Sequence, residues 1–137
     1  MLVSVIIPAY NCEKCIKLTV GSIISSGLTD YEIVIVNDGS TDNTTAVCQS
    51  LCSKYRFIKY IEQQNSGVSV ARNKGISIAV GEYIIFFDAD DTAEESGFSE
   101  CIDIIKNEKP DILIFGMSFD YYKNGKLYRR DNLVPEQ

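Results

Sequence analysis

Three carboxylates lie within four residues at the end of an apolar run. Asp88, Asp90 and Asp91 directly follow the sequence YIIFF at positions 83–87. Divalent cations such as Mn²⁺ and Mg²⁺ prefer oxygen ligands, and Mg²⁺ commonly takes one or two carboxylates together with the phosphates of a substrate. A metal ion held here could neutralise the charge on a departing diphosphate. This acidic turn, residues 88–91, is therefore a candidate metal site.

The same acids could instead cap a following helix. Asp91 with Glu94, and Thr92 with Glu95, have the spacing of a capping box. The two roles are compatible, because the first two acids of the turn could bind a metal while Asp91 or Thr92 caps the helix. Spacing alone leaves both roles open.

Two other polar residues, Tyr10 and Asp38, also follow apolar runs, and each has two possible roles. Asp38 could accept a hydrogen bond from a nucleobase or a ribose. It could equally form an Asx turn ahead of a helix that is capped by Ser40, Thr41 or Asp42. Tyr10 could stack on a nucleobase, or it could pack beneath a loop.

Arg72 is predicted to lie in the first turns of a helix that begins after Gly67. A cation at that position opposes the helix dipole. Either a bound phosphate or a nearby aspartate would resolve this conflict.

The chain has no histidine and five cysteines, which are Cys12, Cys15, Cys48, Cys52 and Cys101. Cys12 and Cys15 stand where a thioredoxin-like redox motif would lie, at the start of a helix that follows a strand. A zinc site built from the first four cysteines is a second hypothesis. The simplest interpretation is that the thiols are reduced and act as small apolar side chains.

Composition limits the class of protein. With 137 residues, 45% of them hydrophobic and 23% charged, the chain is expected to form one domain over residues 1–137. Nineteen acidic and 13 basic residues give a net charge of -6, which argues against a nucleic-acid partner. No segment has the roughly 20 apolar residues of a membrane span, and the N-terminus does not resemble a signal peptide. We therefore expect a cytoplasmic protein.

Strands and helices are predicted to alternate along the chain. The predicted strands are residues 2–8, 31–37, 57–62 and 82–88, and the predicted helices are residues 13–26, 43–54, 69–80 and 94–107. The apolar residues at 33–36 and 84–87 do not alternate with polar ones, which predicts strands buried on both faces. A further strand is predicted at residues 111–119, followed by a hairpin turn at Asn124-Gly125 and a frayed end over residues 131–137.

This alternation predicts an α/β fold with a mostly parallel sheet and helices on both faces. Ligands bind such sheets outside the carboxyl ends of the strands. The polar segments that follow the strands, at residues 8–11, 37–40, 63–67 and 88–91, should therefore meet at one edge. The first of them, PAYN, lacks the glycines of a dinucleotide-binding turn, which argues against a Rossmann dehydrogenase.

Four segments in order together resemble the nucleotide-sugar-binding portion of family 2 glycosyltransferases, which have the GT-A fold. They are SVIIPAYN at residues 4–11, EIVIVNDGSTDNT at 32–44, NSGVSVARNKGI at 65–76 and GEYIIFFDADD at 81–91. The resemblance implies that Pro8, Ala9 and Tyr10 line the base pocket of a nucleotide. It also implies that Asp38 bonds the base and that Arg72 lies near the nucleotide.

In this family the acidic turn corresponds to the DXD element. The resemblance implies that Asp88-Ala89-Asp90 contacts the nucleotide, with Asp88 near the ribose and Asp90 on a Mn²⁺ or Mg²⁺ ion that bridges the phosphates. It further implies a UDP-sugar donor, inversion at the anomeric carbon, and a glycan or lipid-linked acceptor.

The family's catalytic base, an acidic residue in the acceptor half, has no match here. Asp120, Asp131 and Glu136 do not stand in a similar context, so the base is expected beyond residue 137. We expect a truncated donor-binding portion, inactive alone, from an enzyme at the cytoplasmic face of a membrane. Uncovered apolar surface would favour pairing with another chain, such as a homodimer. The alternatives are a nucleotide-binding module without catalysis and a thiol redox protein that uses Cys12 and Cys15.

Overall fold

The structure is a computed structural model that describes residues 1–133. It forms two compact units, which divide after Ser99, and each is described by itself. The first unit alternates strands and helices in the predicted order. Its elements are β1 (Val3–Ala9), α1 (Ile16–Ser25), β2 (Tyr31–Asp38), α2 (Thr44–Lys54), β3 (Ile58–Gln63), α3 (Val68–Ile78) and β4 (Tyr83–Phe86).

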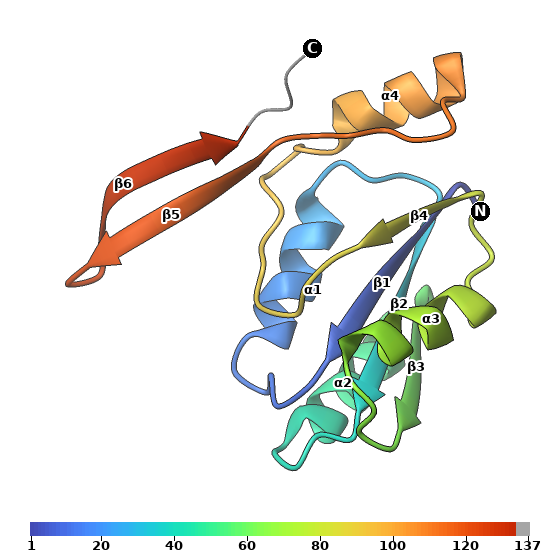
Figure 1. The fold of residues 1–137 in the computed structure, drawn as a ribbon, viewed down its shortest axis with the longest axis vertical. Coiled ribbons are helices and arrows are strands. Elements are labelled where there is room, and N and C mark those ends of the chain that lie inside the picture. The colour runs from blue at the N-terminus through green and yellow to red at the C-terminus, as the bar shows by residue number, and fades with distance from the viewer. Residues whose placement is uncertain (134–137) are drawn as a thin grey trace. The chain divides into compact units, whose positions relative to one another are not determined.

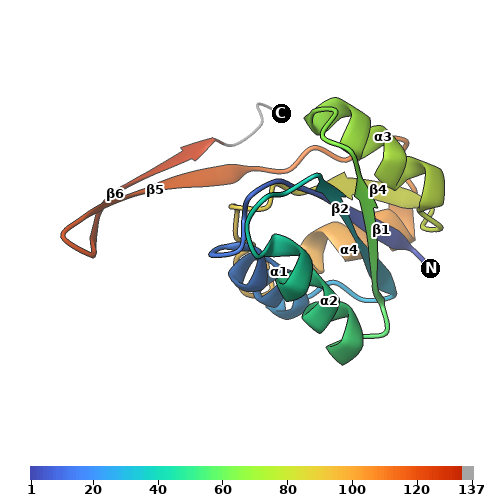
Figure 2. The ribbon, with the colours of Figure 1, turned by 90° about the horizontal axis from the view of Figure 1, so that it is seen from below.

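The four strands of this unit form one parallel sheet in the order β3-β2-β1-β4. Helices α1 and α2 cover one face, and α3 covers the other (Figures 1 and 2). Ala9 pairs with Asn37, and Asp38 pairs with Gln63. The carboxyl ends of β1, β2 and β3 therefore share one edge, as predicted, and the expected α/β architecture is confirmed.

The core lies around the two central strands. Ile33, Val34, Ile35 and Val36 of β2 have no exposed surface, which confirms the prediction of a strand buried on both faces. Side chains of this kind each contribute about 1.5–3 kcal/mol when they are fully buried. The prediction of the same burial for β4 is wrong in part, because Ile84 is 37% and Phe86 47% exposed. β4 is an edge strand, and α3 packs on β1 and β2 instead.

The helix predicted to begin at Glu94 begins five residues later, as α4 (Ser99–Glu108). Ser96 adopts a left-handed backbone with φ of 58°, and the Gly97 amide donates to the Glu94 carbonyl. A tight turn therefore occupies the start of the predicted helix. Left-handed residues occur singly and do not continue a right-handed helix.

The second unit contains α4 and a hairpin formed by β5 (Met117–Lys123) and β6 (Lys126–Leu133). Asn124 and Gly125 both have positive φ, 51° and 74°, as a type I′ turn requires, so the predicted hairpin turn is confirmed. The strand predicted to begin at residue 111 begins instead at Met117, which is the first residue of β5 and pairs with Leu133 of β6. Residues 131–133, expected to be frayed, belong to β6, whereas Glu136 lies outside the described residues. No helix within residues 1–133 is long and apolar enough to cross a membrane.

Candidate functional site

A hollow of about 320 Å³ lies at the carboxyl edge of the sheet. It brings together four of the predicted site residues with two from the segment before α3 and the first residue of that helix. The lining residues are Pro8, Ala9, Tyr10, Asp38, Asn65, Gly67 and Val68. The Tyr10 side chain is 52% exposed, so it does not pack beneath a loop. Its ring is available at the wall of the hollow, where a planar ligand could stack on it.

Asp38 is 5% exposed and holds the segment before α3 in place. Its Oδ1 accepts hydrogen bonds from Gln63 Nε2 and the Ser66 amide, and its Oδ2 accepts one from the Gly67 amide, each at 2.8 Å. Burial alone raises the pKa of this carboxyl, but the three hydrogen bonds outweigh burial and lower its pKa below the usual value. Asp38 is therefore an anion that closes one wall of the hollow.

Asn11, which the sequence analysis overlooked, ties the loop after β1 to the loop after β2. Its Oδ1 accepts hydrogen bonds from the Thr41 amide at 2.8 Å and from the Asp42 amide at 3.4 Å. The backbone amide of Asn11 donates to Ser40 Oγ at 3.0 Å. Asn11 has φ of 48°, a left-handed conformation that asparagine tolerates better than most residues. This tolerance was the only local signal for its role.

Asn37, also overlooked, holds the loop after β2 through hydrogen bonds from within the protein interior. It is fully buried, and its Oδ1 accepts hydrogen bonds from the Ser40 amide at 3.0 Å and from Ser40 Oγ at 2.6 Å. Its Nδ2 donates to Thr45 Oγ1 and Tyr60 Oη, both at 2.9 Å. A buried amide with all these partners holds its position firmly. Three loops at this edge are thus cross-linked by Asn11, Asn37 and Asp38.

The close approach of these loops also requires a glycine. Gly39 has φ of 69°, and a Cβ added there would lie 2.7 Å from the backbone nitrogen of Asn65. Any other residue at position 39 would clash with the wall of the hollow.

The acidic turn leaves β4 at the same edge, because β4 pairs in parallel with β1. Arg72 Nη2 donates to Asp88 Oδ1 at 2.8 Å, and the guanidinium lies 5.7 Å from the centre of the Phe86 ring. This ion pair confirms that a nearby aspartate compensates for Arg72 at the start of α3. Neither residue lines the hollow, so the predicted site residues fall into two groups.

Helix α1 holds the backbone of the acidic turn. The Ala89 carbonyl is buried and accepts a hydrogen bond from Thr19 Oγ1 at 2.7 Å, while the Ala93 amide donates to Ser22 Oγ at 2.9 Å. No local pattern indicated these two hydroxyls, because they lie about 70 residues earlier in the chain. With Ala89 held inward, Asp90 is exposed at the edge of the sheet.

Asp91 does not cap a helix, and neither does Thr92, because α4 begins only at Ser99. Burial, followed by the charges of Asp88 and Asp90, raises the pKa of Asp91. A bound cation would relieve the repulsion among these three carboxylates. Within residues 1–133, however, no three Asp, Glu, Cys or His side chains are arranged to hold a metal ion. A metal here would need oxygen ligands from a substrate in addition to a carboxylate, which is common for Mg²⁺.

The cysteines are all free thiols. Burial raises the pKa of Cys12 to about 11 and that of Cys48 to about 12. Redox motifs require the opposite shift, toward a stable thiolate. The burial of Cys12 and Cys48 therefore argues against the redox hypothesis. In the described part of the chain, residues 1–133, no three cysteines are placed to hold a metal ion, which argues against the zinc hypothesis, so the thiols fit a role as apolar side chains.

Comparison with known proteins identifies relatives for nearly the whole chain. The family model for glycosyl transferase family 2 matches residues 4–136. A cholesterol galactosyltransferase of Borreliella burgdorferi is 35% identical over 133 residues, which are 97% of this chain and 37% of that protein. A chondroitin synthase of Escherichia coli is 33% identical over 133 residues, which are 97% of this chain and 18% of that protein.

Solved structures show the same fold. The crystal structure of residues 1–349 of S. aureus TarS in complex with UDP-GlcNAc superimposes with a TM-score of 0.80 at 29% identity, and the match covers 99% of this chain and 37% of that one. The chain thus spans less than two fifths of each of these three proteins.

Proposed function

Because this chain belongs to glycosyltransferase family 2, we propose that it is the donor-binding portion of an enzyme that transfers a sugar from UDP to an acceptor hydroxyl. The acceptor would be a glycan or a lipid-linked sugar, and the transfer would invert the anomeric carbon. The observation that carries this proposal is the hollow at the carboxyl edge of the sheet, where Tyr10 and Asp38 face a common space. That edge is where α/β sheets bind nucleotides.

In this proposal the hollow receives the uracil base. Tyr10 offers an exposed ring for stacking, and the Asp38 carboxylate still has lone pairs that can accept a hydrogen bond from the N–H of the base. The cross-linked loops hold both side chains in position before the donor arrives. Such preorganisation reduces the entropy that is lost on binding. The similarity to a protein solved with UDP-GlcNAc supports UDP as the nucleotide.

The diphosphate would lie toward the acidic turn. Arg72 and Asp88 form an ion pair near the start of α3, and Asp90 is free of such a partner among the contacts found in residues 1–133. We therefore assign the metal contact to Asp90 and a ribose contact to Asp88. Mn²⁺ or Mg²⁺, when bound, would stabilise the negative charge of the leaving diphosphate. The base that deprotonates the acceptor hydroxyl is expected outside these 137 residues.

Calorimetry of UDP binding, with and without Mn²⁺, tests this assignment. We expect Mn²⁺ to strengthen UDP binding by at least about tenfold, equivalent to about 1.4 kcal/mol. Asp90→Ala should abolish this gain, since it removes the carboxylate that joins metal and protein.

Glu82→Ala is the matched control, because Glu82 is an exposed acid just before the opposite end of the same strand. Its substitution should leave the Mn²⁺ dependence unchanged. If UDP bound equally well without metal, and Asp90→Ala had no effect, the metal assignment would be abandoned. If the native chain bound no UDP under either condition, the proposed donor would be wrong.

A further inference from the structure

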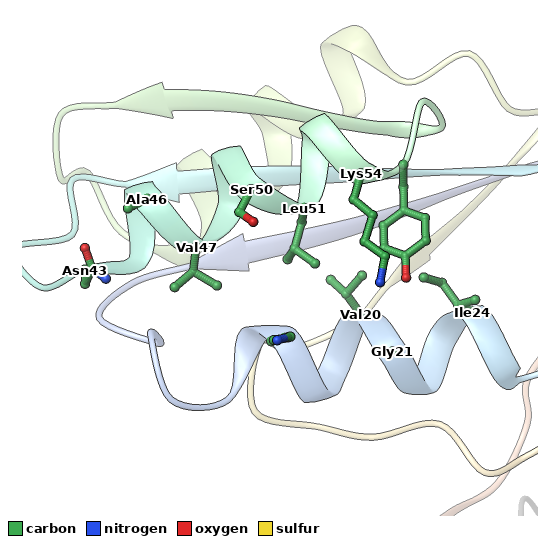
Figure 3. A pocket seen from close by; sticks show the side chains of 11 residues that line it. Val20, Gly21, Ile24, Asn43, Ala46, Val47, Ser50, Leu51 and Lys54 are labelled. Carbon is green, nitrogen blue, oxygen red and sulfur yellow. The ribbon is translucent and has the colours of Figure 1, made fainter.

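A second concave feature lies between α1 and α2, on the face of the sheet opposite α3. It is a groove of about 460 Å³. Its floor is aliphatic, with Val20 and Ile24 from α1 facing Val47 and Leu51 from α2 (Figure 3). Val20 and Leu51 are buried between the helices, whereas Ile24 and Val47 are half-buried and remain accessible. None of these side chains contributes to the proposed donor site.

The residues that line this groove carry positive charge in a negatively charged protein. Lys17 of α1 and Lys54 of α2 line it from opposite helices, and none of its lining residues is acidic, although the net charge of the chain is -6. The nearest acids in the sequence, Glu13 and Asp42, precede the two helices, and Glu13 Oε2 accepts a hydrogen bond from the Asn43 amide. The local field therefore favours an anionic ligand.

Gly21 lies in the middle of α1 and also lines the groove. A Cβ added at Gly21 would meet nothing within 4 Å, so no packing within this unit requires a glycine. Glycine in a helix interior lowers helix stability relative to alanine. Its presence here leaves room for the backbone of another segment to come close to α1.

From the groove, its charge and Gly21 together, we infer that α1 and α2 form a docking site for an acidic amphipathic helix of a partner protein. The partner's aliphatic side chains would fill the floor, and its carboxylates would pair with Lys17 and Lys54. Helices commonly bind grooves in this way. An anionic membrane fits less well, because membrane-binding surfaces project apolar side chains outward, whereas these four line the bottom of a groove. This inference goes beyond donor binding and does not depend on it.

Defined peptides test the inference with the full 137-residue chain. The probe is a fluorescent helical peptide of about 18 residues, long enough to form a marginally stable helix, with leucines along one face and glutamates beside them. A second peptide has lysines in place of the glutamates. We expect the glutamate peptide to bind at least about tenfold more tightly than the lysine peptide, and its affinity to fall as salt is added. Equal binding of the two peptides, or no binding of the glutamate peptide, would overturn the inference.

Variants locate the binding. Lys17→Glu combined with Lys54→Glu should weaken binding of the glutamate peptide by at least about tenfold. Lys74→Glu combined with Lys123→Glu makes the same change of charge at residues that do not line the groove and should have a smaller effect. Gly21→Leu should block binding while keeping or raising the melting temperature, because it replaces a helical glycine at a position where an added Cβ meets nothing within 4 Å and the rest of the side chain projects into the groove. Unchanged binding in Gly21→Leu, or binding to anionic vesicles that exceeds peptide binding, would refute the helix-docking site.

Discussion

Replacing Asn11 by glycine tests whether the loops around the hollow are held in place for the nucleotide. Glycine keeps the left-handed backbone, at φ of 48°, and removes only the side chain. The side-chain carbonyl of Asn11, which this substitution removes, accepts hydrogen bonds from the Thr41 amide at 2.8 Å, Thr41 Oγ1 at 3.3 Å and the Asp42 amide at 3.4 Å. One such bond contributes about 0.5–1.5 kcal/mol, and the two longer ones contribute less. Together they are expected to stabilise the loop by about 1–2 kcal/mol.

The expected loss of UDP affinity follows from this value. If UDP binding requires the ordered loop, the free energy of about 1–2 kcal/mol must be supplied on binding, and affinity should fall by about tenfold. Calorimetry measures the affinity. Amide hydrogen exchange measures the loop directly, and the Thr41 and Asp42 amides should exchange faster in Asn11→Gly even without nucleotide.

Asn124→Gly is the matched control. Asn124 also has a left-handed backbone, with φ of 51°, but it lies in the hairpin turn of the second unit. Both substitutions carry the entropic cost of glycine in the unfolded chain, so the difference between them reports the Asn11 side chain. Equal UDP affinity and equal loop exchange in the two variants would refute a positioning role for Asn11. Absence of UDP binding in the native chain would instead reject the proposed donor.

Two further predictions concern the rest of the first unit. Burial raises the pKa of Glu32, but hydrogen bonds from Lys59, Ser4 and the Val80 amide outweigh burial and hold that pKa below its usual value. Its contribution to stability is therefore present above the unfolded-state pKa of about 4.5 and is lost as the pH falls through the lower, folded-state pKa. Denaturant unfolding should show Glu32→Gln to be less stable by about 1–3 kcal/mol near neutral pH, with a smaller difference under acidic conditions; a constant difference at every pH would contradict this. Because burial raises the pKa of Cys12 to about 11, its thiol should react slowly with a thiol reagent near neutral pH, and Cys12→Ser combined with Cys15→Ser should leave UDP binding unchanged; rapid modification of Cys12 or loss of binding would revive the redox hypothesis.

The alternation of apolar runs and helical spacing was sufficient to predict the parallel sheet, because these periodicities depend on neighbouring residues alone. It also predicted that the polar segments after the strands would share one edge, which places Tyr10 beside Asp38. The turn at Asn124-Gly125 was predictable for the same reason, since both residues favour positive φ.

Burial of β4 and the partners of the polar side chains depended on tertiary structure. Ile84 and Phe86 are residue types that are typical of a central strand, but they are exposed because β4 lies at the edge of the sheet. Asn11 reaches a loop 30 residues later, and Thr19 reaches the acidic turn 70 residues later. No local pattern encodes such contacts, because they depend on how separate segments of the chain come together. The sequence determined which residues could do chemistry at this edge, and the packing of loops and helices decided which of them hold the others in place.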